Sequence, residues 1–332
     1  MSNNPNPKAT RNIVFLVLVA SLGYFVDIYD LLVFSIVRLK SLTDLGITTK
    51  EGLRTGGEFI LNMQMFGLLL GGLIWGIIGD KFGRIKVLFG SILLYSIANF
   101  FNGFVGDINS YAWIRFVAGI GLAGELGAGI TLVSETLSKE NRGYGTMMVA
   151  VIGLFGAVLA NLVAKSFTWH TAYFVGGGLG ILLLLLRLGT FESGLYKNVA
   201  ESPVSKGNLL MLFNNRERFS KYMYCILMGM PLWFVVGILV AQSKEFGEEL
   251  RSAVPLNPGT GIQYSYIGIA IGDLFAGLFA QLTKSRRYTI LVFQLLSVVS
   301  VALYLNAHGI TESQFIWLSL FMGISVGYWA TF

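Results

Sequence analysis

The chain has 332 residues, of which 54% are hydrophobic and only 13% charged, with a net charge of +6 and a mean hydropathy of +0.67. A soluble domain usually carries about 25% charged residues. This composition therefore excludes an ordinary soluble protein and predicts one embedded in a lipid bilayer. One cysteine excludes a disulfide framework, and two histidines are too few for a metal cluster, so we expect no metal and no cofactor.

Ten apolar segments, each long enough to cross a bilayer as a helix, follow a polar tail at residues 1–12. Their approximate bounds are 13–38, 57–79, 87–105, 111–136, 146–166, 171–188, 221–242, 263–283, 288–306 and 315–332. A polar connection at 189–220 separates the first six segments from the last four. We expect a six-helix bundle at 13–188, a cytoplasmic linker at 189–220 and a partial second bundle of four helices at 221–332.

Glycines four residues apart within these segments predict close contacts between helix backbones. The pairs Gly67/Gly71 and Gly72/Gly76 are examples.

The distribution of lysine and arginine predicts the orientation of the chain. With a cytoplasmic N-terminus, the inside loops hold more than twice as many basic residues as the outside loops. The positive-inside rule therefore predicts a multi-pass protein of the cytoplasmic (inner) membrane with its N-terminus inside. These basic residues indicate topology, and we expect no nucleic-acid partner. Because the chain ends at Phe332 within an apolar run, we expect it to be a fragment from which later helices are missing.

Four ionisable residues lie deep in the expected helices, namely Asp27, Asp30, Arg115 and Glu125. Each costs roughly 2.5–3.5 kcal/mol to place in a bilayer, which a purely structural bundle has little reason to carry. Asp27 and Asp30 are three residues apart, so they share one side of the first helix with Tyr24. Neighbouring, desolvated carboxylates hold protons more tightly. We expect Asp27 to handle a proton or substrate, and Asp30 to contribute less; the alternative is a salt-bridged structural carboxylate.

The two charges of the fourth segment have separate interpretations. Arg115 either extends towards the headgroups or pairs with an aspartate of the first helix. Glu125 lies in a glycine-rich stretch at 119–127, where a helix or ligand can approach the backbone, so we expect it to contact substrate or proton. Asp273 is a further candidate whose alternative is a structural role. Aromatic residues of the later helices, which could line a substrate site or simply pack, are Trp233, Tyr328 and Trp329.

The loop between the second and third segments carries a motif. It reads Gly76-Ile-Ile-Gly79-Asp80-Lys81-Phe82-Gly83-Arg84-Ile85-Lys86. This sequence resembles the signature loop of the major facilitator superfamily, Gly-x-x-x-Asp-Arg/Lys-x-Gly-Arg-Arg/Lys. We expect Gly79 to let two helices touch, Gly83 to permit a tight reversal, and Asp80 with Arg84 to form an inner charge lock.

The fourth segment extends the resemblance. Its Arg115, Glu135 and Arg142-Gly143 resemble the fourth helix of the sugar-porter and metabolite:proton symporter branches, and Gly124-Glu125-Leu126-Gly127 is similar to the latter branch. The resemblance implies that Asp27 and Arg115 form a pair tied to proton coupling, and that Glu135 and Arg142 join the inner lock. It also implies an all-α membrane protein of twelve helices in two bundles, about ten of which this chain contains.

Together these observations predict a secondary active transporter that symports a small polar organic metabolite, such as an organic acid, with protons by alternating access. We expect a monomer whose partners are the substrate, the proton and the bilayer. A sugar porter of the same fold is the close alternative, and a membrane sensor that binds solute without moving it is the alternative from another class. An enzyme is not expected, because the sequence has no nucleophile–base set, metal cluster or phosphate loop.

Overall fold

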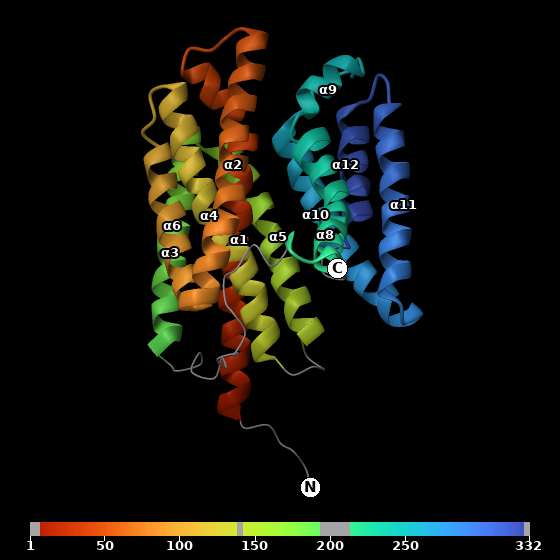
Figure 1. Ribbon diagram of the computed structural model, residues 1–332. Coiled ribbons are helices and arrows are strands. Elements are labelled where there is room, and N and C mark those ends of the chain that lie inside the picture. The colour runs from red at the N-terminus through yellow and green to blue at the C-terminus, as the bar shows by residue number, and fades with distance from the viewer. Residues whose placement is uncertain (1–6, 138–141, 193–212, 329–332) are drawn as a thin grey trace. The chain divides into compact units, whose positions relative to one another are not determined.

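The computed structural model describes residues 7–137, 142–192 and 213–328, and every regular element within those ranges is a helix. The expectation of an all-α fold is confirmed. Figure 1 shows the elements in chain order. The first six helices are α1 (Pro7–Asp44), α2 (Lys50–Phe82), α3 (Arg84–Asn102), α4 (Ile108–Thr136), α5 (Arg142–Ser166) and α6 (Trp169–Glu192).

The later elements are α8 (Arg216–Trp233), the π-helix η1 (Phe234–Val240), α9 (Ser243–Glu249), α10 (Pro258–Thr283), α11 (Arg286–Leu305) and α12 (Glu312–Val326). Each of the ten expected segments overlaps a helix, the seventh being α8 continued by η1; the tenth, expected over 315–332, is helical only to Val326 among the described residues. Pro231 lies inside α8 just before the π-helical turns, where it removes a backbone donor from the helical ladder. The short α9 was not expected.

Seven helices are long and apolar enough to cross a membrane, judged by length and composition among the described residues. They are Val17–Asp44, Lys50–Phe82, Gly145–Ser166, Trp169–Leu188, Arg216–Val240, Pro258–Thr283 and Arg286–Leu305. Large apolar side chains are exposed on several of these helices, for example Phe66, Leu69, Leu182 and Leu295, each more than half exposed. Lipid satisfies such side chains, whereas water would not.

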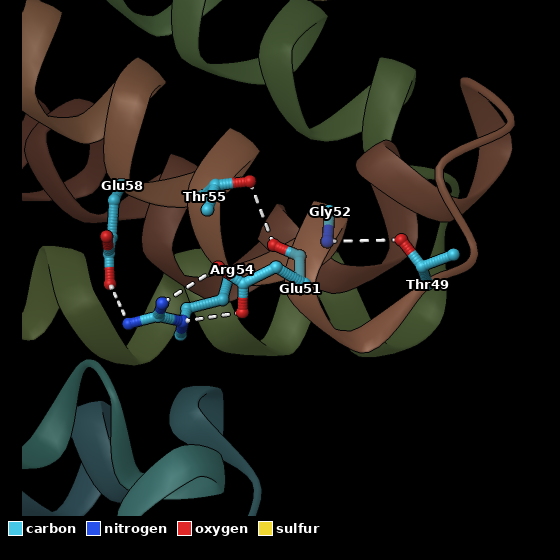
Figure 2. Close-up of polar contacts among 6 residues, drawn as sticks. All are labelled: Thr49, Glu51, Gly52, Arg54, Thr55 and Glu58. Atoms are coloured by element: carbon cyan, nitrogen blue, oxygen red, sulfur yellow. Dashed lines mark hydrogen bonds and ion pairs between the residues drawn. The ribbon is translucent and has the colours of Figure 1, made fainter.

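The start of α2 shows how a helix end is built where it leaves the apolar region. The Thr49 hydroxyl accepts a hydrogen bond from the Gly52 amide at 3.1 Å, which caps the helix. Figure 2 shows Arg54 between Glu51 and Glu58, with nitrogen–oxygen distances of 2.8 and 3.7 Å. These ion pairs are exposed, so they contribute little to stability.

The chain divides into two compact units. Unit 1 comprises Met1–Phe34, Arg38–Gly156 and Ser166–Asn208, and unit 2 comprises Ser35–Val37, Ala157–Lys165 and Leu209–Phe332. In unit 1, α4 packs against α2 and α3, and α3 also packs against α6. In unit 2, α12 packs against α10 and α11.

Glycines bring the backbones of α2 and α4 into direct contact. A Cβ atom added to Gly67 or Gly71 of α2 would collide with backbone atoms of α4, and one added to Gly119 of α4 would collide with the backbone of α2. The expected close contact is not found at Gly72 and Gly76, because a Cβ atom on either would meet none of the described atoms within 4 Å. These two glycines lie on another face of α2, away from the contact.

Candidate functional site

Arg115 lies at the centre of unit 1 and connects four helices. Its side chain is fully buried, and three of its nitrogens donate hydrogen bonds to three different helices. Nη2 donates to the backbone oxygen of Asp30 on α1 at 2.9 Å, Nε to Gln64 Oε1 on α2 at 3.2 Å, and Nη1 to Asn99 Oδ1 on α3 at 2.9 Å. The guanidinium also lies 5.6 Å from the ring centroid of Tyr173 on α6. Arg115 therefore does not extend to a headgroup.

The Asp30 carboxyl lies beside this network. It is fully buried, and Arg115 and Asn99 are its principal electrostatic neighbours. Its two oxygens have no hydrogen-bond partner of ordinary geometry among the described residues. A Cβ atom on Gly176 would collide with Asp30 Oδ1, so this glycine of α6 makes the space that the carboxyl occupies.

The expected ion pair between Asp27 and Arg115 is not formed among the described residues, and Asp30 lies beside Arg115 instead. The physical reason is the level of each aspartate along α1. Three residues separate them, which is a rise of about 4.5 Å, so both share a side of the helix but lie at different heights. Helical periodicity predicts the shared side and leaves the height of a partner on α4 undetermined.

A second buried network lies around Glu125. Arg187 of α6 forms a two-point ion pair with it, in which Nη1 donates to Oε2 at 2.8 Å and Nη2 donates to Oε1. The Glu125 and Arg187 side chains are 2% and 4% exposed. A Cβ atom on Gly23 of α1 would collide with both groups, so the ion pair is seated directly against the α1 backbone. This arrangement gives Glu125 a charged partner that the sequence did not predict.

Asp27 lies next to this ion pair without joining it. Its main electrostatic neighbours are Glu125, Arg187 and Asp30, and the Tyr95 hydroxyl of α3 lies close to its carboxyl. Neither Asp27 oxygen nor the Tyr95 hydroxyl reaches a hydrogen-bond partner of ordinary geometry in the described part of the chain. A buried carboxylate without a partner is costly when ionised, and protonation removes that cost. The position of Asp27 suits a carboxyl that binds and releases a proton.

Aromatic hydroxyls extend from Arg115 towards the ends of α1 and α6. Tyr173, whose ring faces Arg115, shares a hydrogen bond of 2.6 Å with Tyr111, which in turn donates to Ser41 Oγ at 3.4 Å. Trp169 stacks on Tyr111, and its Nε1 donates to Asp44 Oδ2 at 2.9 Å. Sequence reasoning did not identify this group.

The other residues expected to contact substrate lie in varied surroundings. Tyr24 is half-buried against Gly153 of α5 and packs with Ala20 and Val149. Trp233 is 43% exposed at the end of α8. Tyr328 is buried in unit 2, where its hydroxyl donates to the Met228 carbonyl at 2.7 Å. Trp329 lies outside the described residues.

The structure describes only part of the expected inner lock. Gly83 has φ of +91°, which an L side chain adopts only with strain, and it joins α2 to α3. The Asp80 side chain is exposed. A Cβ atom on Gly79 would come within 3.3 Å of Val87. The side chains of Arg84, Glu135 and Arg142 fall outside the described part of the chain, so the lock stays a prediction.

Sequence reasoning missed Arg187, Asn99 and the role of Gln64. Arg187 follows the apolar run Ile181–Leu186 and lies inside the expected segment 171–188, so its position could have identified it as a buried charge. An arginine within a membrane span usually pairs with an acidic side chain or with backbone carbonyls, and Glu125 was one of the buried acids available.

A comparison with protein families gives one match over nearly the whole chain. The model described as Major Facilitator Superfamily matches residues 13–332.

Similar curated proteins are transport proteins. A protein of Haemophilus influenzae named as a metabolite transport protein is 25% identical over 86% of this chain and 71% of its own length. The niacin transporter NiaP of Acinetobacter baylyi is 29% identical over 49% of this chain and 37% of its own length. The 3-(3-hydroxy-phenyl)propionate transporter of Escherichia coli is 29% identical over 39% of this chain and 33% of its own length. The matches thus span from about a third to about seven tenths of these relatives.

Among solved structures, the xylose transporter XylE of E. coli, in a partially occluded inward-open conformation, has a TM-score of 0.67. The match covers 96% of this chain and 85% of that chain at 16% identity, so it concerns the fold alone.

Proposed function

Because the chain belongs to the Major Facilitator Superfamily, a family of transporters rather than enzymes, we propose that the complete protein symports a small polar organic metabolite with protons. The observation that carries this proposal is the buried charge of unit 1. Asp27, Asp30 and Glu125 lie beside only two arginines of the described network, Arg115 and Arg187. Placing such a charge network inside a bilayer costs free energy, so its presence indicates a function.

The names of the relatives support a small organic acid as the substrate class. Niacin and 3-(3-hydroxyphenyl)propionate, which two relatives are named for, are both small aromatic carboxylic acids. A substrate anion that enters with a proton crosses the membrane with less net charge. A sugar remains the second candidate, and the fold it would use is that of XylE.

In the proposed mechanism, alternating access exposes the site first to one side of the membrane and then to the other. An aspartate of α1 takes up a proton when the substrate binds. Release of this proton on the other side of the membrane completes the step. Asp80, Arg84, Glu135 and Arg142 would close the inner side as a charge lock. The proposed setting is the cytoplasmic membrane, with the N-terminus inside and one copy acting alone.

Uptake by the full-length protein in liposomes tests the proposal. With niacin, 3-(3-hydroxyphenyl)propionate and xylose as probes, we expect one acid to accumulate when the outside is more acidic and to stop accumulating when the pH gradient is collapsed. Asp27→Asn should reduce this accumulation at least tenfold, whereas counterflow of the same probe should continue. Glu58→Gln, which changes an exposed carboxylate, is the matched control and should transport normally.

Two outcomes would overturn the proposal. Absence of counterflow with every probe would favour a sensor, because a sensor binds solute and exchanges nothing. Accumulation in Asp27→Asn equal to that of the unchanged protein would remove the coupling role of Asp27.

A further inference from the structure

We propose that Arg187 is a positioning residue that decides which of two buried carboxyl groups, Asp27 or Glu125, carries a single proton. In the structure Arg187 holds Glu125, and the proton belongs on Asp27. When the guanidinium changes partner from Glu125 to Asp27, the proton passes from the Asp27 carboxyl to the Glu125 carboxylate. This inference deepens the proposed proton coupling and rests on it.

The first support is the geometry of the ion pair. Arg187 of α6 and Glu125 of α4 meet at two points, and both side chains are excluded from solvent. A two-point guanidinium–carboxylate contact strongly favours the ionised carboxylate. Glu125 is therefore the group that keeps its negative charge in this state.

The second support is the reach of Arg187 to Asp27. The guanidinium lies against Gly23 of α1, and Asp27 follows Gly23 by four residues, one helical turn further on the same face. One turn is about 5.4 Å of rise. Arg187 is already one of the main electrostatic neighbours of Asp27, and the arginine side chain has several rotatable bonds with which it can shift its guanidinium. Gly23 supplies the path, because a side chain there would fill it.

The third support is the charge count around Asp27. Among the described residues, the titratable groups that face it are Glu125 of α4, Arg187 of α6, Asp30 of α1 and the Tyr95 hydroxyl of α3. Asp30 has Arg115 as its own cationic neighbour. The remaining triad of Asp27, Glu125 and Arg187 has one carboxyl more than it has cations, so one bound proton makes it neutral. Movement of the proton within the triad leaves that total unchanged.

The fourth support is that Asp27 has no hydrogen-bond partner of ordinary geometry among the described residues, although Tyr95 lies close by. An ionised carboxylate in that position would lack the compensation that Glu125 has. The neutral, protonated form of Asp27 fits this position. When Asp27 ionises, the nearby Tyr95 hydroxyl can donate a hydrogen bond to its carboxylate.

Carbodiimide labelling tests the assignment without any transport substrate. Dicyclohexylcarbodiimide partitions into membranes and modifies protonated carboxyl groups, and peptide mass spectrometry locates the label. In the full-length protein in liposomes, we expect the label on Asp27 and little on Glu125, with Asp27 labelling falling as the pH rises.

Three variants separate a positioning role from a structural one. In Glu125→Gln, the negative charge next to Arg187 is removed and the Arg187 charge acts on Asp27, so the pH of half-labelling of Asp27 should fall by about one to three units. In Arg187→Gln, both carboxyls lack their cation, and both should be labelled up to a higher pH. In the double variant Glu125→Gln/Arg187→Gln, Asp27 labelling should return close to that of the unchanged protein.

Opposite shifts of the two single variants, with recovery in the double variant, are expected if the charges of Arg187 and Glu125 together set the protonation of Asp27. If Arg187→Gln does not fold, Arg187→Lys, which keeps the charge, should label like the unchanged protein, and Glu125→Gln still carries the test. Unchanged Asp27 labelling in Glu125→Gln would overturn the inference. Failure of pH-driven uptake with the labelling pattern intact would count against symport alone.

Discussion

Arg115 connects its own helix to three others through hydrogen bonds. Its three hydrogen bonds end on acceptors of α1, α2 and α3. Hydrogen bonds to charged groups contribute about 1.5–3 kcal/mol each, and a buried acceptor left without a donor adds to the loss. The planar guanidinium fits this divergent set, whereas the compact ammonium of lysine does not.

We therefore predict that Arg115→Lys lowers the free energy of unfolding by about 3 kcal/mol and abolishes transport. The matched control is Arg54→Lys, whose ion pairs with Glu51 and Glu58 are exposed. Thermal unfolding in detergent measures both variants. An equal, small change in melting temperature for the two would contradict the assignment of Arg115 as the central hydrogen-bond donor of unit 1.

At this scale the sequence predicted which charges are buried better than which charges meet. Asp27, Asp30, Arg115 and Glu125 are all buried, as expected from their place in apolar runs. The partners differ, because a pairing depends on the relative heights of two helices and single-helix periodicity does not contain them. The same limit hid Arg187, whose partner lies 62 residues earlier in the chain.

Between elements, glycines allow the backbones of α2 and α4 to touch in unit 1. Only glycines on the face of α2 that meets α4 contribute to this contact. Gly67 lies against the α4 backbone, whereas Gly72 of the same helix has no described atom close to its Cβ position. Sequence spacing identifies both as parts of glycine pairs and does not distinguish them, because which face of α2 meets α4 is a tertiary property.

Substitution at these two positions tests the distinction. Gly67→Ala should destabilise the protein by about 1–3 kcal/mol, because the added methyl forces two backbones apart. Gly72→Ala should be neutral or slightly stabilising, since alanine favours the helix by roughly 1 kcal/mol over glycine. Melting temperatures of the purified proteins decide the matter, and a larger loss for Gly72→Ala would refute the packing described here.

Over the whole molecule, hydropathy predicted the number and type of elements well. The ten expected segments coincide with helices because burial in lipid requires every backbone polar group to be bonded within its own segment. Hydropathy did not predict two irregular elements, the π-helix η1 after Pro231 and the short helix α9, because neither produces a separate apolar run in the sequence.

Orientation is a property of the entire chain and is tested by cysteine accessibility. In a Cys225→Ser background, which removes the sole cysteine, Gly106→Cys and Lys81→Cys place thiols in the α3–α4 loop and near the α2–α3 loop. With the N-terminus inside, a membrane-impermeant maleimide should label Gly106→Cys in intact cells and Lys81→Cys only after permeabilisation. The reverse pattern would invert the proposed topology.

The hydrogen bonds of Arg115 also bear on how the chain enters the membrane. Its acceptors, on Asp30, Gln64 and Asn99, all precede it in sequence, so synthesis delivers them to the bilayer before α4 leaves the ribosome. Arg187 likewise follows both Asp27 and Glu125. The acceptors of each arginine are therefore already in the membrane when the helix that carries the arginine is inserted. This order shortens the time that an unpaired guanidinium spends in hydrocarbon. The order of residues along the chain therefore favours insertion of the hydrogen-bond acceptors before the arginine donors.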